Sequence, residues 1–177
     1  IISCVLLAWL LCGCSTGGKH SFSTDYFRID VNSKGYIDGM WNTTKAGSNF
    51  SPADRPSPLL SLYNSKHKCY YYPVKATYSG GKYRLEYENG AVAVVRIEEK
   101  DRYFKFTLDA LENRDDIDAV QWGTYHTNIT NLFGEIIGVA RDTTEQVNYS
   151  IGVLALDDNT LGGTADLQGD ADRKSTR

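Results

Sequence analysis

Short runs in which apolar and polar residues alternate follow one another between residues 25 and 157. In residues 82–88 three apolar side chains alternate with charged ones, and residues 27–32 repeat the pattern. Residues two apart on an extended strand point to the same face, so each run predicts a strand with one face on a core. The expected core-facing residues are Phe27, Ile29, Val31, Tyr83, Leu85, Tyr87, Phe104, Phe106, Leu108, Val147, Tyr149, Ile151 and Val153.

Turn-forming residues separate these runs, as in Ser33-Lys34-Gly35, Ser79-Gly80-Gly81 and Glu88-Asn89-Gly90. The last is a tight hairpin signal, because Asn-Gly favours a type I′ turn in which both central residues have positive φ. About ten strands at roughly ten- to fifteen-residue spacing are typical of an all-β, antiparallel β-sandwich. Little helix is expected; residues 108–114 could form a turn or two, and residues 42–58 read as a long polar loop.

The length and net charge of the chain limit the number of domains and the kinds of partner to expect. A chain of 177 residues with a net charge of −3 suits one domain of ordinary size, with acids and bases mixed along it. Because no basic stripe appears, nucleic acid is not an expected partner, and neutral or weakly charged ligands fit better. The three histidines lie far apart and make no zinc pattern with the cysteines, so neither metal nor cofactor is expected.

The N-terminal residues have the pattern expected of a targeting signal. The apolar stretch 5–11, followed by Cys12-Gly13-Cys14-Ser15, resembles the lipobox of bacterial lipoprotein precursors. The resemblance implies that residues 1–13 are a signal peptide, that Cys14 carries the lipid, and that residues 14–24 are a tether. The stretch is shorter than the about 20 residues needed to span a bilayer. The expected location is the cell envelope, on a bacterial membrane, with the outer membrane favoured and its face left open. A buried N-terminal strand or helix is the alternative.

If Cys14 is lipidated and the two cysteines before it leave with the signal, Cys69 alone remains in the folded part. No internal disulfide can then form, so stability must come from the core.

Residues 120–128 are the strongest candidate for ligand binding, because they bring aromatic and amide side chains together. Sugars are recognised by flat aromatic faces and by planar polar side chains. In a regular strand Trp122 and His126 would share one face, and Tyr125 would lie on the other. The alternative is that Trp122 or Tyr125 packs in the core with its polar tip bonded. The candidate binding residues are Gln121, Trp122, Tyr125, His126 and Asn128, and no catalytic residue is proposed.

Carboxylates cluster at 98–99, 115–118 and 157–158. Glycosidases use paired carboxylates, but adjacent strand residues point to opposite faces, and these clusters lie at expected strand ends. Solvated turn charges are therefore the favoured interpretation. Glu135 and Arg141-Asp142 flank an apolar run, where an ion pair or a turn role is favoured. The run 70–72 of three tyrosines could stack on a ligand or pack within a sheet.

Several strands together resemble a known family. Residues 27–30 followed by 35–40 look like the first hairpin of galactose-mutarotase-like β-sandwich domains, and residues 82–87, 91–94 and 103–106 resemble their succeeding strands. Such domains stand at the N-terminus of many bacterial glycoside hydrolases and some polysaccharide lyases. The resemblance covers roughly residues 25 to 160 and implies a glycan partner and a catalytic domain further along the chain.

These observations together predict a β-sandwich over residues 25–162, followed by a linker or frayed end over residues 163–177. The expected function is that of the N-terminal β-sandwich portion of a lipid-anchored, glycoside-hydrolase-type enzyme, supporting a glycan site without itself being catalytic. Two alternatives stay open. One is a non-catalytic glycan-binding lipoprotein that feeds a polysaccharide uptake system, and the other is a structural envelope domain.

Overall fold

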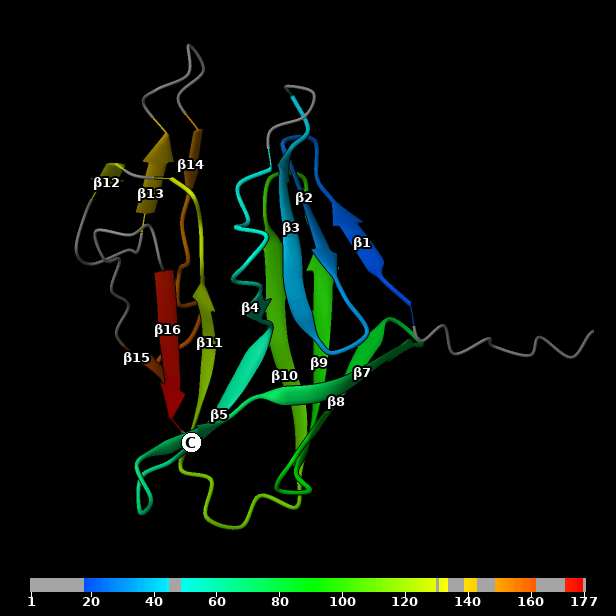
Figure 1. Cartoon of the computed structure of the whole chain (residues 1–177), viewed down its shortest axis with the longest axis vertical. Coiled ribbons are helices and arrows are strands. Elements are labelled where there is room, and N and C mark those ends of the chain that lie inside the picture. The colour runs from blue at the N-terminus through cyan, green and yellow to red at the C-terminus, as the bar shows by residue number, and fades with distance from the viewer. Residues whose placement is uncertain are drawn as a thin grey trace, which may run out of the picture.

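The computed structural model describes residues 18–44, 49–129, 131–133, 139–142, 149–161 and 171–176. All the regular secondary structure in this part of the chain consists of β-strands, which confirms the all-β, antiparallel sandwich-like fold (Figure 1). None of these residues belongs to a helix that is long and apolar enough to cross a membrane. Cys14 lies outside the described residues.

Four antiparallel sheets contain the described strands. The first, in the order β1-β2-β3-β4, contains His20–Ser23, Phe27–Val31, Tyr36–Asn42 and Ser57–Pro58. The second, in the order β10-β9-β8-β7, contains Phe104–Glu112, Val92–Glu99, Lys82–Tyr87 and Pro73–Ser79. The third, in the order β15-β16-β11-β5-β6, contains Thr160–Leu161, Ala171–Thr176, Ala119–Tyr125, Leu60–Asn64 and Cys69–Tyr71. The fourth, in the order β12-β13-β14, contains Asn131–Phe133, Val139–Asp142 and Tyr149–Ile151.

One hydrophobic core joins the first three sheets. The leucines at the start of β5 lie at its centre, since Leu59, Leu60 and Leu62 are completely buried. The backbone carbonyls of Leu59 and Leu60 accept hydrogen bonds from the hydroxyls of Tyr125 on β11 and Tyr87 on β8. The β5 segment is therefore tied to strands of two sheets by both packing and hydrogen bonds.

The period-two pattern identifies part of the core. Of the expected core-facing residues, Ile29, Val31, Tyr83, Leu85 and Tyr87 are buried. Val147 lies outside the described residues. Phe106 and Ile151 are only partly buried and pack against the core from outside. Their partial exposure marks the edge at which the candidate site forms.

The hairpin between β8 and β9 forms where Asn89-Gly90 predicts it, but with a different turn. The Gly90 N–H donates a hydrogen bond to the Tyr87 carbonyl, and the Ala91 carbonyl accepts one from the Tyr87 N–H. Gly90 has a φ of 82°, whereas Asn89 is not among the residues with positive φ. This is the geometry of a type I turn followed by a left-handed glycine, so the expected type I′ turn is wrong.

Two segments pair more extensively than their composition suggests. Residues 171–176, expected to be a linker or frayed end, form β16 and pair with both β11 and β15. Residues 20–23, expected to be part of a tether, form β1, and Phe22 is buried in the core. Residues 108–112, in which a short helix was conceivable, belong to β10. Of these segments, β16 pairs with the distant strand β11, whereas β1 and β10 pair with β2 and β9, their neighbours along the chain.

The polar loop after β3 folds back onto that strand. The Asn49 side-chain oxygen accepts hydrogen bonds from the backbone N–H groups of Met40 and Ser51, each 3.0 Å long. The Phe50 N–H donates to the Met40 carbonyl, and the Phe50 ring is buried. Residues 49–51 therefore extend the first sheet beside β3.

A buried carboxylate links three strands of the first sheet through hydrogen bonds. Asp30 on β2 is 3% exposed. It accepts hydrogen bonds of 2.7 Å from the Ser21 hydroxyl on β1 and of 2.7 Å from the Trp41 indole N–H on β3. Lys19 and Arg28 lie 3.4 Å and 3.2 Å from its oxygens. Each neighbouring strand thus sends a donor to the same carboxylate.

Gly39 provides the space that this arrangement needs. A Cβ at this position would lie 2.5 Å from the Trp41 indole nitrogen and 2.6 Å from an Asp30 oxygen. Any larger residue would therefore push the indole away from the carboxylate. The glycine is required by close approach rather than by an unusual φ.

Replacing Leu85 by alanine is expected to lower the free energy of unfolding by about 2–5 kcal/mol, because it removes most of a fully buried side chain. Urea denaturation measures the change. Leu156→Ala is the matched control, since Leu156 is 64% exposed and its truncation should cost less than about 0.5 kcal/mol. Equal losses in the two variants would contradict the placement of the core.

Asp30→Asn is expected to lower stability at neutral pH by about 1–3 kcal/mol, because it removes a charged hydrogen-bond acceptor. Burial alone would raise the pKa of Asp30, but the bonds from Ser21 and Trp41 and the charges of Lys19 and Arg28 outweigh it and lower the pKa below 3.8. The carboxylate therefore stabilises the fold above about pH 4, and this stabilisation is lost as the pH falls through the lowered pKa.

Urea unfolding at several pH values tests this expectation. The variant should lose less stability than the parent chain on acidification below about pH 4. Asp25→Asn, at an exposed position in the turn before β2, is the control. A variant with the same stability and the same acid profile as the parent would show that Asp30 does not fasten the sheet.

Candidate functional site

A cleft of about 860 Å³ lies where the first three sheets diverge. Its walls are β10, β11 and the segment 151–160, and Ile37 and Met40 of β3 contribute to its lining. Residues 102–108 all line it without a break, so the cleft runs along the flank of β10 rather than over one of its faces. β10 is the terminal strand of the second sheet in the described part of the chain, which leaves this flank accessible. The aromatic lining residues are Tyr26, Phe27, Tyr103, Phe104, Phe106, Trp122 and Tyr125.

An irregularity in β11 decides which of its side chains enter the cleft. Trp122 pairs with Arg173 and Tyr125 with Ala171, so three steps along β11 match two steps along β16. The extra residue brings Trp122 and Tyr125 to the same side, and both rings lie near Phe106, at centroid distances of 6.1 and 6.3 Å. The expectation from regular alternation, which separates these two residues, is therefore wrong.

Trp122 forms part of the cleft wall. Its ring and that of Phe106 are inclined by only 26° and are stacked. Trp122 is partly buried, packs against the core and lines the cleft. It therefore combines a packing role with a surface that a ligand in the cleft can reach.

Tyr125 is a buried part of the same wall. The side chain is 5% exposed, and its hydroxyl donates to the Leu59 carbonyl at 3.3 Å. Burial raises the pKa of this hydroxyl far above its ordinary value, so it stays protonated. The hydroxyl serves the core, which is the alternative role that the sequence left open.

The other three candidates lie outside the cleft. Gln121 is buried, and its amide donates to the Thr124 hydroxyl at 3.4 Å. The His126 N–H donates to the Ser57 hydroxyl at 2.7 Å, and the Asn128 amide donates to the Asn49 carbonyl at 3.0 Å. The last two contacts join the segment after β11 to β4 and to the loop before it. Of the five candidates, Trp122 and Tyr125 line the cleft.

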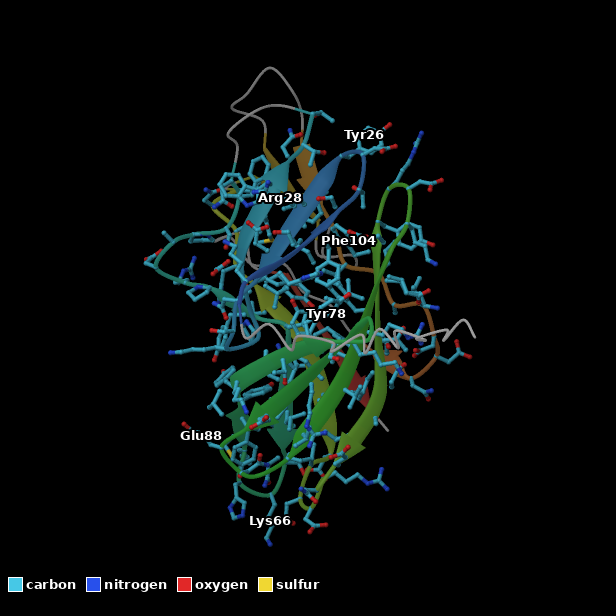
Figure 2. All side chains as sticks on the ribbon, turned by 90° about the vertical axis from the view of Figure 1, so that its right-hand side faces the viewer. Tyr26, Arg28, Lys66, Tyr78, Glu88 and Phe104 are labelled. Carbon is cyan, nitrogen blue, oxygen red and sulfur yellow. The ribbon has the colours of Figure 1, made fainter. Side chains whose placement is uncertain are left out.

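The rim holds aromatic residues that the sequence analysis did not single out. Tyr26 and Tyr103 are 44% and 55% exposed, and the Arg102 guanidinium lies over the Tyr26 ring at 5.5 Å from its centroid. Figure 2 shows Tyr26 at the turn before β2, on the same side of the molecule as Phe104. Phe27 and Phe104 are in contact, with their centroids 5.7 Å apart. The sequence does contain a signal for this rim, because an aromatic pair stands at the start of β2 (Tyr26-Phe27) and another at the start of β10 (Tyr103-Phe104).

Polar groups are few in the cleft and lie at defined places. The Asp157 carboxylate accepts hydrogen bonds from the Asn159 N–H and the Thr160 hydroxyl, each 3.0 Å long, and so orders the turn at one end. The Thr107 hydroxyl oxygen is buried and makes no hydrogen bond with the described residues. Arg102 and Lys105 add positive charge along β10. Aromatic surface with a sparse set of polar groups suits a small or chain-like organic ligand.

The carboxylate clusters that the structure describes have structural partners. Asp118 accepts from the Ser65 N–H at 2.7 Å, and Glu99 accepts from the Ser23 N–H at 2.6 Å. Glu98 pairs with Arg96 at 3.0 Å and with Lys100 at 3.1 Å. Glu135 lies outside the described residues. Within the described chain no group of three or more metal-ligating side chains comes together.

Tyr125→Phe is expected to lower the free energy of unfolding by about 1 kcal/mol, because the Leu59 carbonyl loses its buried donor. Denaturant unfolding measures the loss. Tyr103→Phe removes a hydroxyl from a ring that is 55% exposed and should leave stability unchanged. If Tyr125→Phe were as stable as the parent chain, its hydroxyl would not be part of the core.

Comparisons with protein-family models, with curated proteins and with solved structures found no match to this chain. Function is therefore inferred from the residues and the geometry of the cleft.

Proposed function

We propose that this chain is the β-sandwich portion of a carbohydrate-active protein and that the cleft beside β10 contacts a glycan. The observation that carries the proposal is the aromatic lining of an 860 Å³ cleft that is open to solvent along its rim. The strand pattern of residues 25–160, which resembles that of galactose-mutarotase-like domains, favours the same ligand class.

The chemistry of the lining supports a sugar ligand. Pyranose rings present flat patches of C–H groups, which pack favourably on the electron-rich faces of aromatic rings. Trp122 and Phe106 offer such surface inside the cleft, and Tyr103 offers it at the rim. Sugar hydroxyls need hydrogen-bond partners, and Arg102 and Asp157 are placed along the same walls.

A binding role suits this part of the chain better than a catalytic one. Asp157 is the single carboxylate among the described lining residues, and it already bonds Asn159 and Thr160. Glycoside hydrolysis usually employs two carboxylates across the scissile bond. In the proposed parent enzyme, of glycoside hydrolase type, the reacting groups would belong to another domain. A non-catalytic glycan-binding lipoprotein that serves polysaccharide uptake is the second candidate, favoured by this same single carboxylate.

The proposal includes attachment to a bacterial membrane through a lipid on Cys14. Its support is the apolar stretch followed by small residues and cysteine. β1 begins at His20, only six residues after Cys14, so such an anchor would hold the sandwich close to the membrane surface. A glycan captured in the cleft would then be held at the cell envelope.

Binding of the purified chain to a panel of neutral and acidic polysaccharides tests the proposal. Trp122→Ala should weaken binding at least about tenfold, which corresponds to about 1.4 kcal/mol of lost aromatic contact. Tyr103→Ala should weaken it by a smaller factor. Because Trp122 also packs against Phe106, the exposed Tyr103 provides the variant whose folding is not at risk.

Arg84→Ala is the control, since Arg84 is exposed on β8 and does not line the cleft. Its affinity should equal that of the parent chain. Failure of the parent chain to bind any polysaccharide would contradict the proposal and would leave a structural envelope role. Binding that survives both aromatic substitutions would contradict the assignment to this cleft.

A further inference from the structure

A row of tyrosines lies on the face of the third sheet that points away from the cleft. Leu62 of β5 is buried and pairs with Val120, which lines the cleft. The next residue, Tyr63, therefore points to the opposite face, where it pairs with Tyr70 of β6. The ring centroids of Tyr63 and Tyr70 are 4.8 Å apart, and those of Tyr70 and Tyr72 are 6.4 Å apart with planes inclined by 27°.

This tyrosine row (Tyr63, Tyr70 and Tyr72) is accessible to solvent. Tyr63 and Tyr70 are partly exposed, and Tyr72 is 50% exposed. Next to Tyr72 along the chain, Pro73 and Val74 border a groove of about 460 Å³, and Val74 is 43% exposed. The groove therefore begins one residue after Tyr72 along the chain. The other residues that line the groove are Asn32, Lys34, Tyr36 and Pro56.

Positive charge flanks the row at both ends. Lys66 and Lys68 lie in the turn between β5 and β6, and Lys34 lines the groove. Figure 2 shows Lys66 at the extreme end of the molecule. All three lysines are exposed, and no ion pair joins them to a carboxylate of the described residues, whereas Lys75 and Lys82 are paired at 2.9 and 2.8 Å.

We propose that the tyrosine row and its flanking lysines form a second binding surface, for an extended acidic polysaccharide. The rings supply flat faces for successive sugar units, and the unpaired ammonium groups supply partners for uronate carboxylates. A line of rings suits a linear chain better than a compact ligand. The inference rests on the proposed function only in taking a glycan as the ligand class.

Single-stranded nucleic acid is the competing occupant, because bases also stack on aromatic rings beside basic side chains. The net charge of −3 and the carboxylates of Glu88, Asp116 and Asp118 on neighbouring turns disfavour a phosphate backbone, which carries a charge at every unit. An acidic polysaccharide with spaced charges tolerates these neighbours better.

Affinity electrophoresis of the purified chain tests the inference. The gels contain hyaluronate, in which every second sugar carries a carboxylate, or a neutral galactan, or no polysaccharide. The parent chain should be retarded by hyaluronate, and Tyr72→Ala should weaken that affinity about fivefold, as expected for loss of one aromatic contact. Lys66→Gln combined with Lys68→Gln should weaken it by a similar factor and reduce its sensitivity to salt.

Arg84→Ala, outside both the tyrosine row and the cleft, is the control and should leave retardation by hyaluronate in place. Affinity lost in Tyr72→Ala and kept in Tyr103→Ala would support the second surface even if the cleft bound nothing. Affinity lost only in Tyr103→Ala would overturn it and leave the proposed function intact. Absence of retardation by hyaluronate, or stronger binding to oligo(dT) than to hyaluronate, would also overturn it.

Discussion

The burial of the leucines at the start of β5 is the interaction on which the rest of the structure depends. Leu59, Leu60 and Leu62 are completely shielded from water. Their neighbourhood joins the second and third sheets because Tyr87 and Tyr125 reach the same short segment from β8 and β11. Hydrophobic burial supplies the driving force here, and the two tyrosine hydroxyls satisfy backbone carbonyls that water cannot reach.

The cleft follows from the limits of that core. β10 is the last strand of its sheet in the described chain, and its apolar residues are only partly covered. The bulge in β11 turns Trp122 and Tyr125 toward Phe106, so the uncovered flank is lined by rings rather than by polar side chains. Thus β11 contributes both to the core, through Tyr125, and to the accessible wall, through Trp122. The opposite face of the same sheet carries the tyrosine row, which gives the third sheet two aromatic surfaces.

The sequence predicts those parts of the fold in which local pattern and burial agree. Leu85 and Val31 are buried as period-two alternation requires, and the β8–β9 hairpin lies at Asn89-Gly90. The pairing of β16 with β11, which is distant in sequence, could not be predicted from the local pattern. β16 carries no large apolar residue, and its membership of the third sheet depends on backbone pairing with β11.

The candidate site was predictable in part for the same reason. Trp122 was found because aromatic and amide residues gather around it in the sequence. The faces of β11 could not be assigned correctly, because a bulge shifts alternation by one residue and depends on the partner strand. Tyr26 and Arg102 come together only through the fold, since they are far apart in the chain and meet at the rim.

The proposed function depends on one point above all, that a glycan docks on the ring-lined flank of β10. Nuclear magnetic resonance titration of the isotopically labelled chain with a polysaccharide fragment that it binds addresses this claim directly. The account predicts that the Trp122 indole N–H and the amides of residues 102–108 and 152–160 shift together, while those of the β7–β8 turn stay in place. Shifts confined to the β7–β8 hairpin, with the Trp122 signal unmoved, would contradict it.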